Sequence, residues 1–362
     1  MRSGSGGPAD PVGDDTGRAG ADPGRRRRRR LLVAALALLL VPLVAVGGYL
    51  GYLNHLVETN VRHADLLPGP DARSLLGQPG DVGAPPGTAG PPVVAGPGPV
   101  DSRPVPLTGA GEDYPLLGSD ARAGEAAGRS DVIVIVHVPK DPKRIQLVHF
   151  PRDLYVTIPG HGKNKINAAY AFGGAPLLVR TLQDLLGIRV DHVALVGFEG
   201  FKAMTDAVGG VDVNVEEPSS ENGYAFAKGM MHLNGDQALA FVRERYQLSQ
   251  GDISRGRRQQ AFIKALMLKG LSRDTLANPA QLAKFSDAAS RYLTVDQSLQ
   301  GSDMRSEALR LRDLRGSDIV FVTAPFSGFG TAPDGGAIDI VDQPRMAQLG
   351  NALRTDTMDA YQ

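Results

Sequence analysis

The stretch GRSDVIVIVHVPKDPKRIQLVHFPRDLYVTIPG, residues 128–160, decides the fold of this chain. It holds two short runs rich in Val and Ile, Val132–Val138 and Ile145–Phe150, joined by a six-residue connection. Runs of this kind predict strands that are buried on both faces, in the interior of a sheet. Six residues are too few for a crossover, so the two strands are predicted to be antiparallel neighbours.

Polar residues flank these two strands. Arg129 and Asp131 precede or open the first run, and Arg152 and Asp153 follow the second. In an antiparallel pair the end of the second strand lies beside the start of the first. We therefore expect Asp131 and Arg152 at one edge of the sheet, and we expect the chemistry there.

The remainder of the folded part mixes strands with helices. Four helices are predicted: one that Pro176 opens, one over Phe198–Val208 that Gly209-Gly210 ends, one that the capping pair Asn234 and Gln237 begins, and one over Ile253–Leu271. Strands are predicted at Val193–Phe198, Val211–Val215 and Ile319–Thr323. This mixture predicts an α/β fold, a three-layer α/β/α sandwich around a mixed, largely antiparallel central sheet. The domain is expected to span residues 113–362, with a core over about residues 113–300.

The N-terminal part predicts a membrane anchor. Residues 1–30 are rich in Gly, Ser, Asp and Pro, predict a disordered tail, and end in the run Arg25–Arg30. Leu31–Leu53 is mostly apolar and would measure about 35 Å as a helix, enough to cross a bilayer. The Arg run predicts a cytoplasmic N-terminus, and hence a single-pass protein of the cell membrane with an extracytoplasmic domain.

Two other interpretations of this region were weighed. A cleaved signal peptide is the stronger rival, but the apolar run is long for one and GGYLGYL lacks a clear A-x-A cleavage site. The Arg run could also bind nucleic acid, although it directly precedes the apolar span. Residues 54–112 follow as a predicted extracytoplasmic linker, since residues 64–112 contain 11 Pro and 10 Gly in 49 positions. As a flexible coil such a linker spans about 40 Å.

Composition excludes several function classes. The formal net charge is zero, and beyond residue 30 the chain has 31 basic against 35 acidic residues, so no excess of positive charge favours nucleic acid as a partner. Cysteine is absent, which excludes disulfides, thiolate metal sites and a Cys nucleophile. The ordered part has no phosphate-binding G-x-x-x-x-G-K-[ST], no H-E-x-x-H and no G-x-S-x-G motif.

Arginine and carboxylate remain as the candidate chemistry. Asp120 in LLGSDAR and Asp131 in GRSD lie before and at the entry of the first central strand. Magnesium is commonly held by one or two carboxylates together with substrate phosphates. With Arg122, Arg129 and Arg152 nearby, the two Asp suit a metal-bound diphosphate. The alternative is structural, with Asp120 capping a turn and Asp131 pairing with Arg129.

Two further arginine groups fit the same chemistry. In FPRD, Arg152 directly follows a strand, where bidentate contact with phosphate is easy; a structural pair with Asp153 is the alternative. Arg243 and Arg245 would point about 200° apart in a continuous helix, so both reach one site only if the helix stops near Arg243. The next helix brings more of the same residue types: Arg255 and Gln259 share a helix face, with Arg258 beside them. The alternative there is a solvated basic helix.

Taken together and in order, the motifs resemble the LytR-CpsA-Psr family over about residues 113–300. They are LLGSDAR, GRSD, HFPRDLYVTIPG, KINAAYAFGG, GVDVNV, LNGDQALAFVRER and GD-x2-R-x2-RQQ. The resemblance implies transfer of a glycopolymer from a polyprenyl-diphosphate carrier to peptidoglycan, usually onto the muramic acid 6-hydroxyl. It also implies an α/β/α sandwich with an apolar tunnel for the lipid, and Mg²⁺ as the cofactor.

The resemblance assigns roles by motif position. Asp120 and Asp131 correspond to the metal-side carboxylates. The residues that correspond to the diphosphate-binding set are Arg122, Arg152, Lys165, Arg243, Arg245, Arg255 and Gln259. Arg129 is added to this set because it precedes the first central strand. Lys163 is an alternative to Lys165, and QLSQG replaces an acidic-Pro pair found in many relatives. A carboxylate near Asp120 or Asp153 is a hypothetical general base. Two rival functions remain, a polyprenyl-diphosphate hydrolase and a non-catalytic lipid-binding regulator.

Overall fold

The computed structural model of the chain describes residues 47–69, 111–119 and 130–361. The chain divides into two compact units, Met1–Tyr52 and Leu53–Gln362. Within the described residues, no helix combines the length and apolarity that crossing a bilayer requires. The predicted tail, residues 1–30, and most of the predicted span, residues 31–53, lie outside the described residues. Residues 47–60 are helical.

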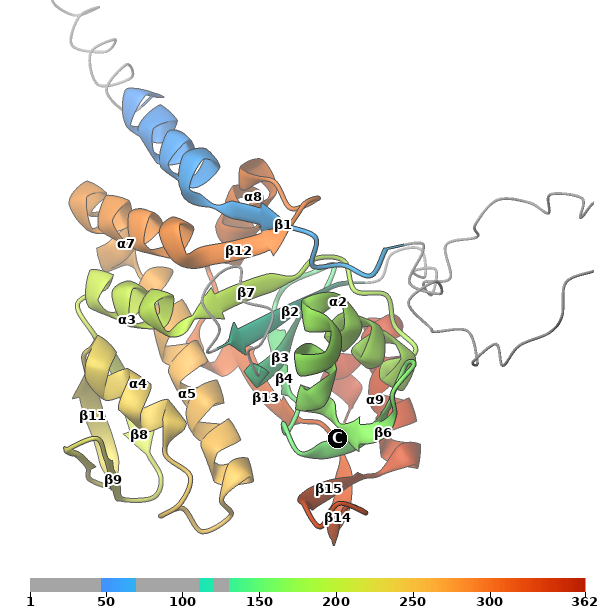
Figure 1. Ribbon diagram of the computed structural model, residues 1–362. Coiled ribbons are helices and arrows are strands. Elements are labelled where there is room, and N and C mark those ends of the chain that lie inside the picture. Colours follow the sequence, from blue (N-terminus) through green and yellow to red (C-terminus); the bar gives the residue numbers. More distant parts are fainter. Residues whose placement is uncertain (1–46, 70–110, 120–129, 362) are drawn as a thin grey trace, which may run out of the picture. The chain divides into compact units, whose positions relative to one another are not determined.

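A seven-stranded sheet organises the second unit (Figure 1). Its strands, in spatial order, are β1 (Arg62–Ala64), β12 (Leu293–Asp296), β7 (Ala194–Gly197), β2 (Glu112–Ser119), β3 (Ser130–Val138), β4 (Ile145–His149) and β13 (Ile319–Thr323). The predicted hairpin is confirmed, because β3 and β4 are antiparallel neighbours inside the sheet, with Val134 opposite His149. The sheet is mixed but not largely antiparallel: β1–β12, β2–β7 and β4–β13 are parallel pairs.

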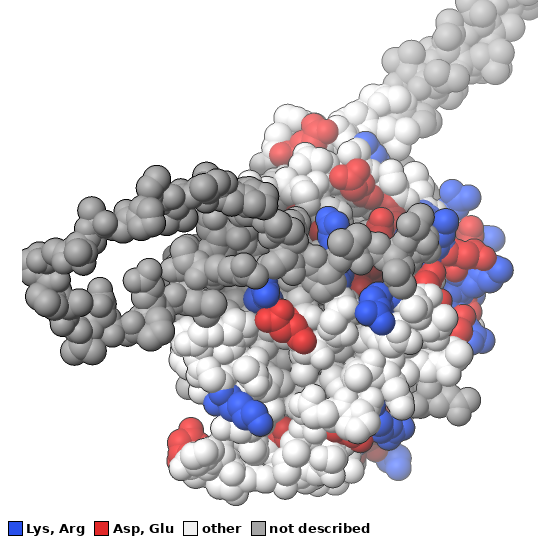
Figure 2. All heavy atoms as spheres, turned by 90° about the vertical axis from the view of Figure 1, so that its right-hand side faces the viewer, with Lys and Arg blue, Asp and Glu red and all other residues white. Residues whose placement is uncertain are grey.

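Helices cover both faces of this sheet. Because side chains alternate along β3, Ile133 and Ile135 pack toward α2 (Ile166–Leu186) and α9 (Gln343–Arg354), while Val134 packs toward α5 (Asp252–Gly270). Figure 1 shows α2 and α9 on one side of the sheet, and α5, α3 (Phe198–Ala207) and α7 (Pro279–Tyr292) on the other. Figure 2 shows the face at the right of Figure 1, where acidic and basic side chains are interspersed.

A second sheet of four strands, in the order β14-β15-β5-β6, follows the central hairpin. Its strands are β5 (Leu154–Ile158), β6 (Gly162–Lys165), β14 (Phe326–Thr331) and β15 (Ala337–Val341). The remaining elements are two small hairpins, β8 (Val211–Val215) with β11 (Gly229–Leu233) and β9 (Ser219–Glu221) with β10 (Tyr224–Phe226), the helices α4 (Gly235–Arg243), α6 (Arg273–Leu276) and α8 (Gly301–Leu311), and 3-10 turns at Gly316–Asp318 and Met358–Ala360.

The local signals of the sequence explain several of these elements. The Asn234 side chain accepts from the Gln237 N–H and the Gln237 side chain accepts from the Asn234 N–H, which confirms the predicted capping box of α4. Gly209 and Gly210 have positive φ after α3, as a helix-stop signal requires. Helix α2 is interrupted by non-helical Gly173 and Gly174, so Pro176 sits in the first turn of its second half.

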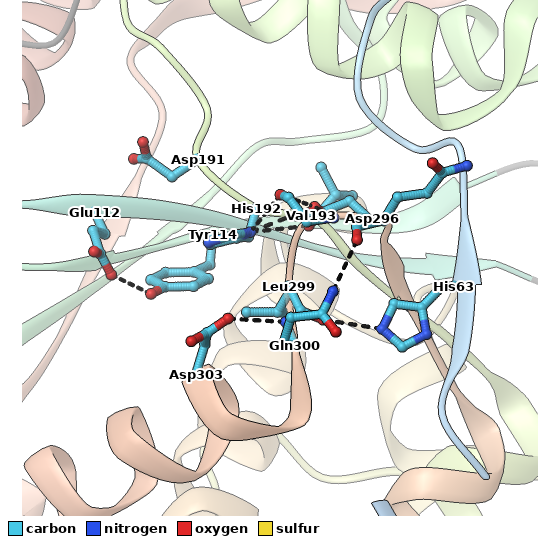
Figure 3. Close-up of polar contacts among 12 residues, drawn as sticks. His63, Glu112, Tyr114, Asp191, His192, Val193, Asp296, Leu299, Gln300 and Asp303 are labelled. Atoms are coloured by element: carbon cyan, nitrogen blue, oxygen red, sulfur yellow. Dashed lines mark hydrogen bonds and ion pairs between the residues drawn. The ribbon is translucent and has the colours of Figure 1, made fainter. Parts of the chain in front are cut away.

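Residues 54–69, assigned to the linker by the sequence, belong to the fold. Strand β1 pairs with β12, and Val61 and Leu66 are buried. Figure 3 shows the contacts beside this pair: the Nε2 of His63 lies 3.1 Å from the Leu299 carbonyl, and Asp296 accepts from His192 and from the Val193 N–H. Three residues of strand carry no detectable period, which is why the sequence did not reveal β1. Residues 70–110 therefore lie between two strands of one sheet.

Candidate functional site

One edge of the central sheet collects the segments that the sequence singled out. The Phe150 N–H donates to the Ile133 carbonyl at 2.9 Å, so the chain leaves β4 beside the start of β3. Ser119, which ends β2, is paired with Gly197, which ends β7. The loop from β2 to β3, the segment after β4 and the start of α3 consequently emerge at the same edge.

The predicted metal ligands fall where the structure gives no side-chain detail. Asp120, Arg122 and Arg129 lie outside the described residues, and Asp131 is described only as backbone in β3. In the part of the chain with described side chains, no three His, Asp or Glu side chains form a group suited to a metal ion.

The FPRD turn places Arg152 and Asp153 at this edge, just before β5. Asp153 Oδ1 lies 2.8 Å from Lys165 Nζ and 4.0 Å from Arg152 Nε, so the close partner of Asp153 is the lysine. The Asn167 N–H donates to the Arg152 carbonyl at 3.2 Å and thereby fixes the start of α2 against the turn. Lys163, two residues earlier on β6, is exposed. This geometry favours Lys165 over Lys163.

Arg243 and Arg245 take different directions after α4. The helix ends at Arg243 and Glu244 is extended, which is the condition under which both arginines could reach one site. The Arg243 guanidinium lies 4.9 Å from the centre of the Phe198 ring, at the end of β7. A hydrogen bond to the Tyr246 hydroxyl raises the pKa of Arg245, and the charges of Asp252 and Asp153 raise it further. Arg245 therefore adjoins the FPRD turn.

The first turn of α5 supplies the next charged pair. Arg255 is buried and forms an ion pair with Asp252. Burial raises the pKa of Asp252, while the charges of Arg255, Arg152 and Arg245 lower it and that of Asp153 raises it. Arg152, Asp153, Arg245 and Arg255 therefore lie within electrostatic range of Asp252.

Two residues grouped with Arg255 in the sequence are as buried as Arg255 itself. Gln259 is buried, and its Nε2 lies 3.5 Å from the Val242 carbonyl. Arg258 donates to the Glu217 carbonyl at 2.6 Å and its guanidinium lies 4.5 Å from the centre of the Phe241 ring. Arg258 is thus a core residue, and the basic run is not a solvated helix face.

Helix α5 is fixed against the end of β4 by a close approach. A Cβ added at Gly256 would lie 2.3 Å from His149 Cε1, so only glycine permits this contact. Burial and the neighbouring Arg255 lower the pKa of His149 to about 3, so the imidazole is neutral at physiological pH.

Two carboxylates of the site were not assigned from the sequence. Asp252 lies in the GD-x2-R motif but was given no role. Asp339 lies in β15, and the backbone N–H of Asp339 donates to the Asp153 carbonyl at 3.0 Å. Asp339 is 5% exposed, and its Oδ2 has no hydrogen-bond partner among the residues that the structure describes. Burial, Asp153 and Asp252 raise the pKa of Asp339 to about 6. The sequence signal that could have revealed Asp339 was a single acidic residue within a short apolar strand.

The cluster thus combines four cations, Arg152, Lys165, Arg245 and Arg255, with three carboxylates. Guanidinium groups bind phosphate oxygens in bidentate fashion, and partial burial strengthens such contacts. The arrangement is suited to a multiply charged anion such as a diphosphate.

Comparisons with known proteins identify relatives of this chain. The model of the LytR_cpsA_psr family matches residues 114–355. The polyisoprenyl-teichoic acid–peptidoglycan teichoic acid transferase TagU of Bacillus mycoides is 44% identical over 164 residues, which cover 45% of this chain and 54% of TagU. The cell wall biosynthesis protein LcpA of Corynebacterium glutamicum is 35% identical over 253 residues, 61% of this chain and 48% of LcpA. The match thus spans about half the length of these relatives.

Solved structures share the fold. Bacillus subtilis TagV superimposes with a TM-score of 0.60 at 26% identity, covering 70% of this chain and 99% of TagV. TagT bound to LI-WTA gives a TM-score of 0.56 at 27% identity, covering 69% and 92%.

Proposed function

Because this chain belongs to the LytR-CpsA-Psr family, we propose that it transfers a glycopolymer from a polyprenyl-diphosphate carrier onto peptidoglycan, forming a phosphodiester at the muramic acid 6-hydroxyl. The observation that carries the proposal is the cluster of Arg152, Lys165, Arg245 and Arg255 around Asp153 and Asp252 at the sheet edge. The names of the teichoic acid transferase relatives point to the same class of donor and acceptor.

The cationic side chains would bind the diphosphate and stabilise its charge. Arg152, Arg245 and Arg255 come from three segments, so they can approach the phosphoryl oxygens from different sides. An acceptor hydroxyl attacks the phosphorus of the glycan phosphate, the new O–P bond forms, and polyprenyl phosphate leaves with the electrons of the broken P–O bond. Donors fixed before the reaction stabilise the developing charge without reorganisation.

Magnesium fits as the cofactor by the chemistry of its proposed ligands. Asp120 and Asp131 offer the hard carboxylate oxygens that Mg²⁺ prefers, and Asp131 lies in β3, whose start is beside the segment that carries Arg152. Bound there, the ion would neutralise phosphoryl charge. Asp153 or Asp120 is the proposed general base for the acceptor hydroxyl; full activity of an Asp153→Asn variant would remove Asp153 from this role.

The asymmetric packing of the sheet supports a site for the polyprenyl chain. On the face toward α2, the side chains of Leu117, Ile133 and Val148 are completely buried. On the face toward α3, α5 and α7, the apolar side chains Leu116, Val132, Val136 and Val196 are only half-buried although their strands are interior to the sheet. Apolar surface left accessible between a sheet and its helices suits an isoprenoid chain.

The location proposed for this chemistry is outside the cell membrane, with residues 31–53 as the anchor. The absence of Cys makes a direct measurement possible. Single Cys residues introduced at position 5 and on exposed Ser317 of the full chain would be labelled in intact cells with a membrane-impermeant maleimide. Labelling at position 317 alone supports the proposed topology, and labelling at neither or at both positions contradicts it.

The activity is tested with the full chain, a polyprenyl-diphosphate-linked glycan and peptidoglycan fragments, in magnesium or in chelator, with products identified by mass spectrometry. We expect a metal-dependent glycan–muropeptide phosphodiester. Free phosphorylated glycan with polyprenyl phosphate, in the presence of a competent acceptor, would indicate a hydrolase instead. No turnover despite tight binding of the lipid diphosphate would indicate a lipid-binding regulator.

A further inference from the structure

The loop between α4 and α5, residues 244–251, is held in place from both sides. The Gln247 side chain accepts from the Ser220 N–H at 3.0 Å and donates to the Ser220 carbonyl at 2.8 Å. The Ser249 N–H donates to Glu217 Oε2 at 2.7 Å, and Leu248 is buried. The conformation of this loop is therefore set by the fold before any ligand binds.

On this fixed loop, Tyr246 is 83% exposed. Its hydroxyl accepts from Arg245 at 3.0 Å, and the same guanidinium lies 4.8 Å from the ring centre. The hydrogen bond from Arg245 lowers the pKa of Tyr246, and the charges of Arg152 and Arg255 lower it further. The exposed ring thus contacts Arg245, and the charges of Arg152 and Arg255 reach its hydroxyl.

An exposed aromatic ring at a fixed position is typical of a ligand-binding surface, since the ring offers a large contact area at little conformational cost. The C–H face of a pyranose ring is apolar and packs on aromatic rings. When Arg245 contacts a diphosphate, its stacked neighbour Tyr246 lies where the next group of the ligand must be. In a polyprenyl-diphosphate glycan that group is either the isoprenoid chain or the first sugar, and the 83% exposure of the ring to solvent favours the polar sugar.

We propose that Tyr246 stacks on the first sugar of the glycan and so forms a donor-sugar subsite beside the diphosphate-binding arginines. This inference rests on the proposed function and adds to it a residue that separates glycan-bearing from glycan-free lipid diphosphates. The aromatic ring provides the contact, and the hydroxyl orients the ring through Arg245.

The test measures dissociation constants by titration calorimetry, using the full chain in detergent with magnesium. The two ligands are a polyprenyl diphosphate without sugar and the same lipid carrying one N-acetylhexosamine. For Tyr246→Leu we expect an unchanged constant for the sugar-free lipid and a roughly fivefold to tenfold weaker one for the sugar-bearing lipid. Tyr246→Phe, which keeps the ring, should stay within about twofold of wild type for both lipids.

Phe329→Leu is the matched control, since it removes another exposed aromatic ring, on β14. It should change neither constant. Equal weakening of both lipids in the Tyr246 variants would show that the residue only positions Arg245, and no weakening of either would show that it makes no contact; both results overturn the subsite while leaving the diphosphate site. Failure of the wild-type chain to bind either lipid overturns the proposed function, and the subsite with it.

Discussion

Arg255 is a buried cation at the start of a helix, beside the carboxylate of Asp252. Its guanidinium has lost most of its water before a ligand arrives, so a phosphate that reaches it need not displace a full hydration shell. Burying such a group is costly, and the ion pair offsets part of the cost. The helix N-terminus adds a field that opposes the arginine and favours an anion.

Replacement of Arg255 by Lys should separate the contribution of its planar guanidinium geometry from that of its positive charge. Arg255→Lys keeps the charge but removes the planar fork, so we expect kcat/KM for glycan transfer to fall about 100-fold with little change in the thermal midpoint. The control is Arg257→Lys, two residues along the helix, whose guanidinium pairs with Glu216 and Glu217 instead. Equal rates for the two variants would contradict the role of Arg255.

Asp339 is a buried carboxylate, and unlike Arg255 it has a polar atom, Oδ2, without a hydrogen-bond partner among the described residues. Its pKa is about 6 in the folded protein against an ordinary value of 3.8. Between these values the folded state holds a proton that the unfolded state has lost, so this group makes stability fall as the pH rises from about 4 to about 6. Above pH 6 both states are ionised and the full destabilisation is present.

An uncharged isostere should remove this dependence. Asp339→Asn is expected to be more stable than wild type above pH 6, with an advantage that disappears below about pH 4. Urea denaturation of both proteins at pH 7.5, 5 and 4 measures the difference. A constant difference across this range would mean that Asp339 does not titrate as its surroundings indicate.

At the scale of elements, the contact between Gly256 in α5 and His149 at the end of β4 fixes the first turn of the helix. An alanine in a helix interior is ordinarily about 1 kcal/mol more favourable than glycine. Here the added Cβ would lie 2.3 Å from His149 Cε1, so the helix or the ring must move.

Gly256→Ala should therefore destabilise the protein by about 2 kcal/mol and lower activity, because displacement of α5 also displaces Arg255. Removing the ring should relieve the clash, so we expect His149→Ala with Gly256→Ala to be more stable than the sum of the two single changes predicts. Denaturant unfolding of all four proteins gives the coupling. Additive free energies would show that the two residues do not clash.

Elements with local signals were predicted from the sequence, and elements defined by distant partners were not. The β3–β4 hairpin, the capping box of α4 and the glycine stop after α3 each depend on residues a few positions apart. The parallel pairs β1–β12 and β4–β13 join strands over 170 residues apart in sequence, which is why the sheet was expected to be largely antiparallel.

The same reason limits what the sequence says about the site. The FPRD turn and the GD-x2-R motif were found, since the residues of each lie near each other in the chain. Asp339 reaches Asp153 only through the pairing of β15 with β5, a long-range contact. Helical spacing placed Arg258 near Arg255 but could not reveal that Phe241 and the Glu217 carbonyl lie on that side.

At the scale of the whole molecule, the boundary of the folded unit determines which fragments are stable. A fragment of residues 113–362 lacks β1, so β12 would become an unpaired edge and Val295 would lose its contact with Val61. We expect its thermal midpoint to be at least about 5 °C below that of residues 53–362. Scanning calorimetry of both fragments tests this, and equal midpoints would place β1 outside the cooperative unit.

The position of residues 70–110 between β1 and β2 also changes what their length controls. A segment that joins an anchor to a domain sets how far the domain can travel from the bilayer, whereas a segment closed at both ends by one sheet contributes only the entropy of closing a loop. Halving it should therefore stabilise the fold by about 0.6 kcal/mol. With residues 31–53 as the proposed anchor, the length of this segment would not set the reach of the domain, which would depend instead on the residues between that anchor and β1.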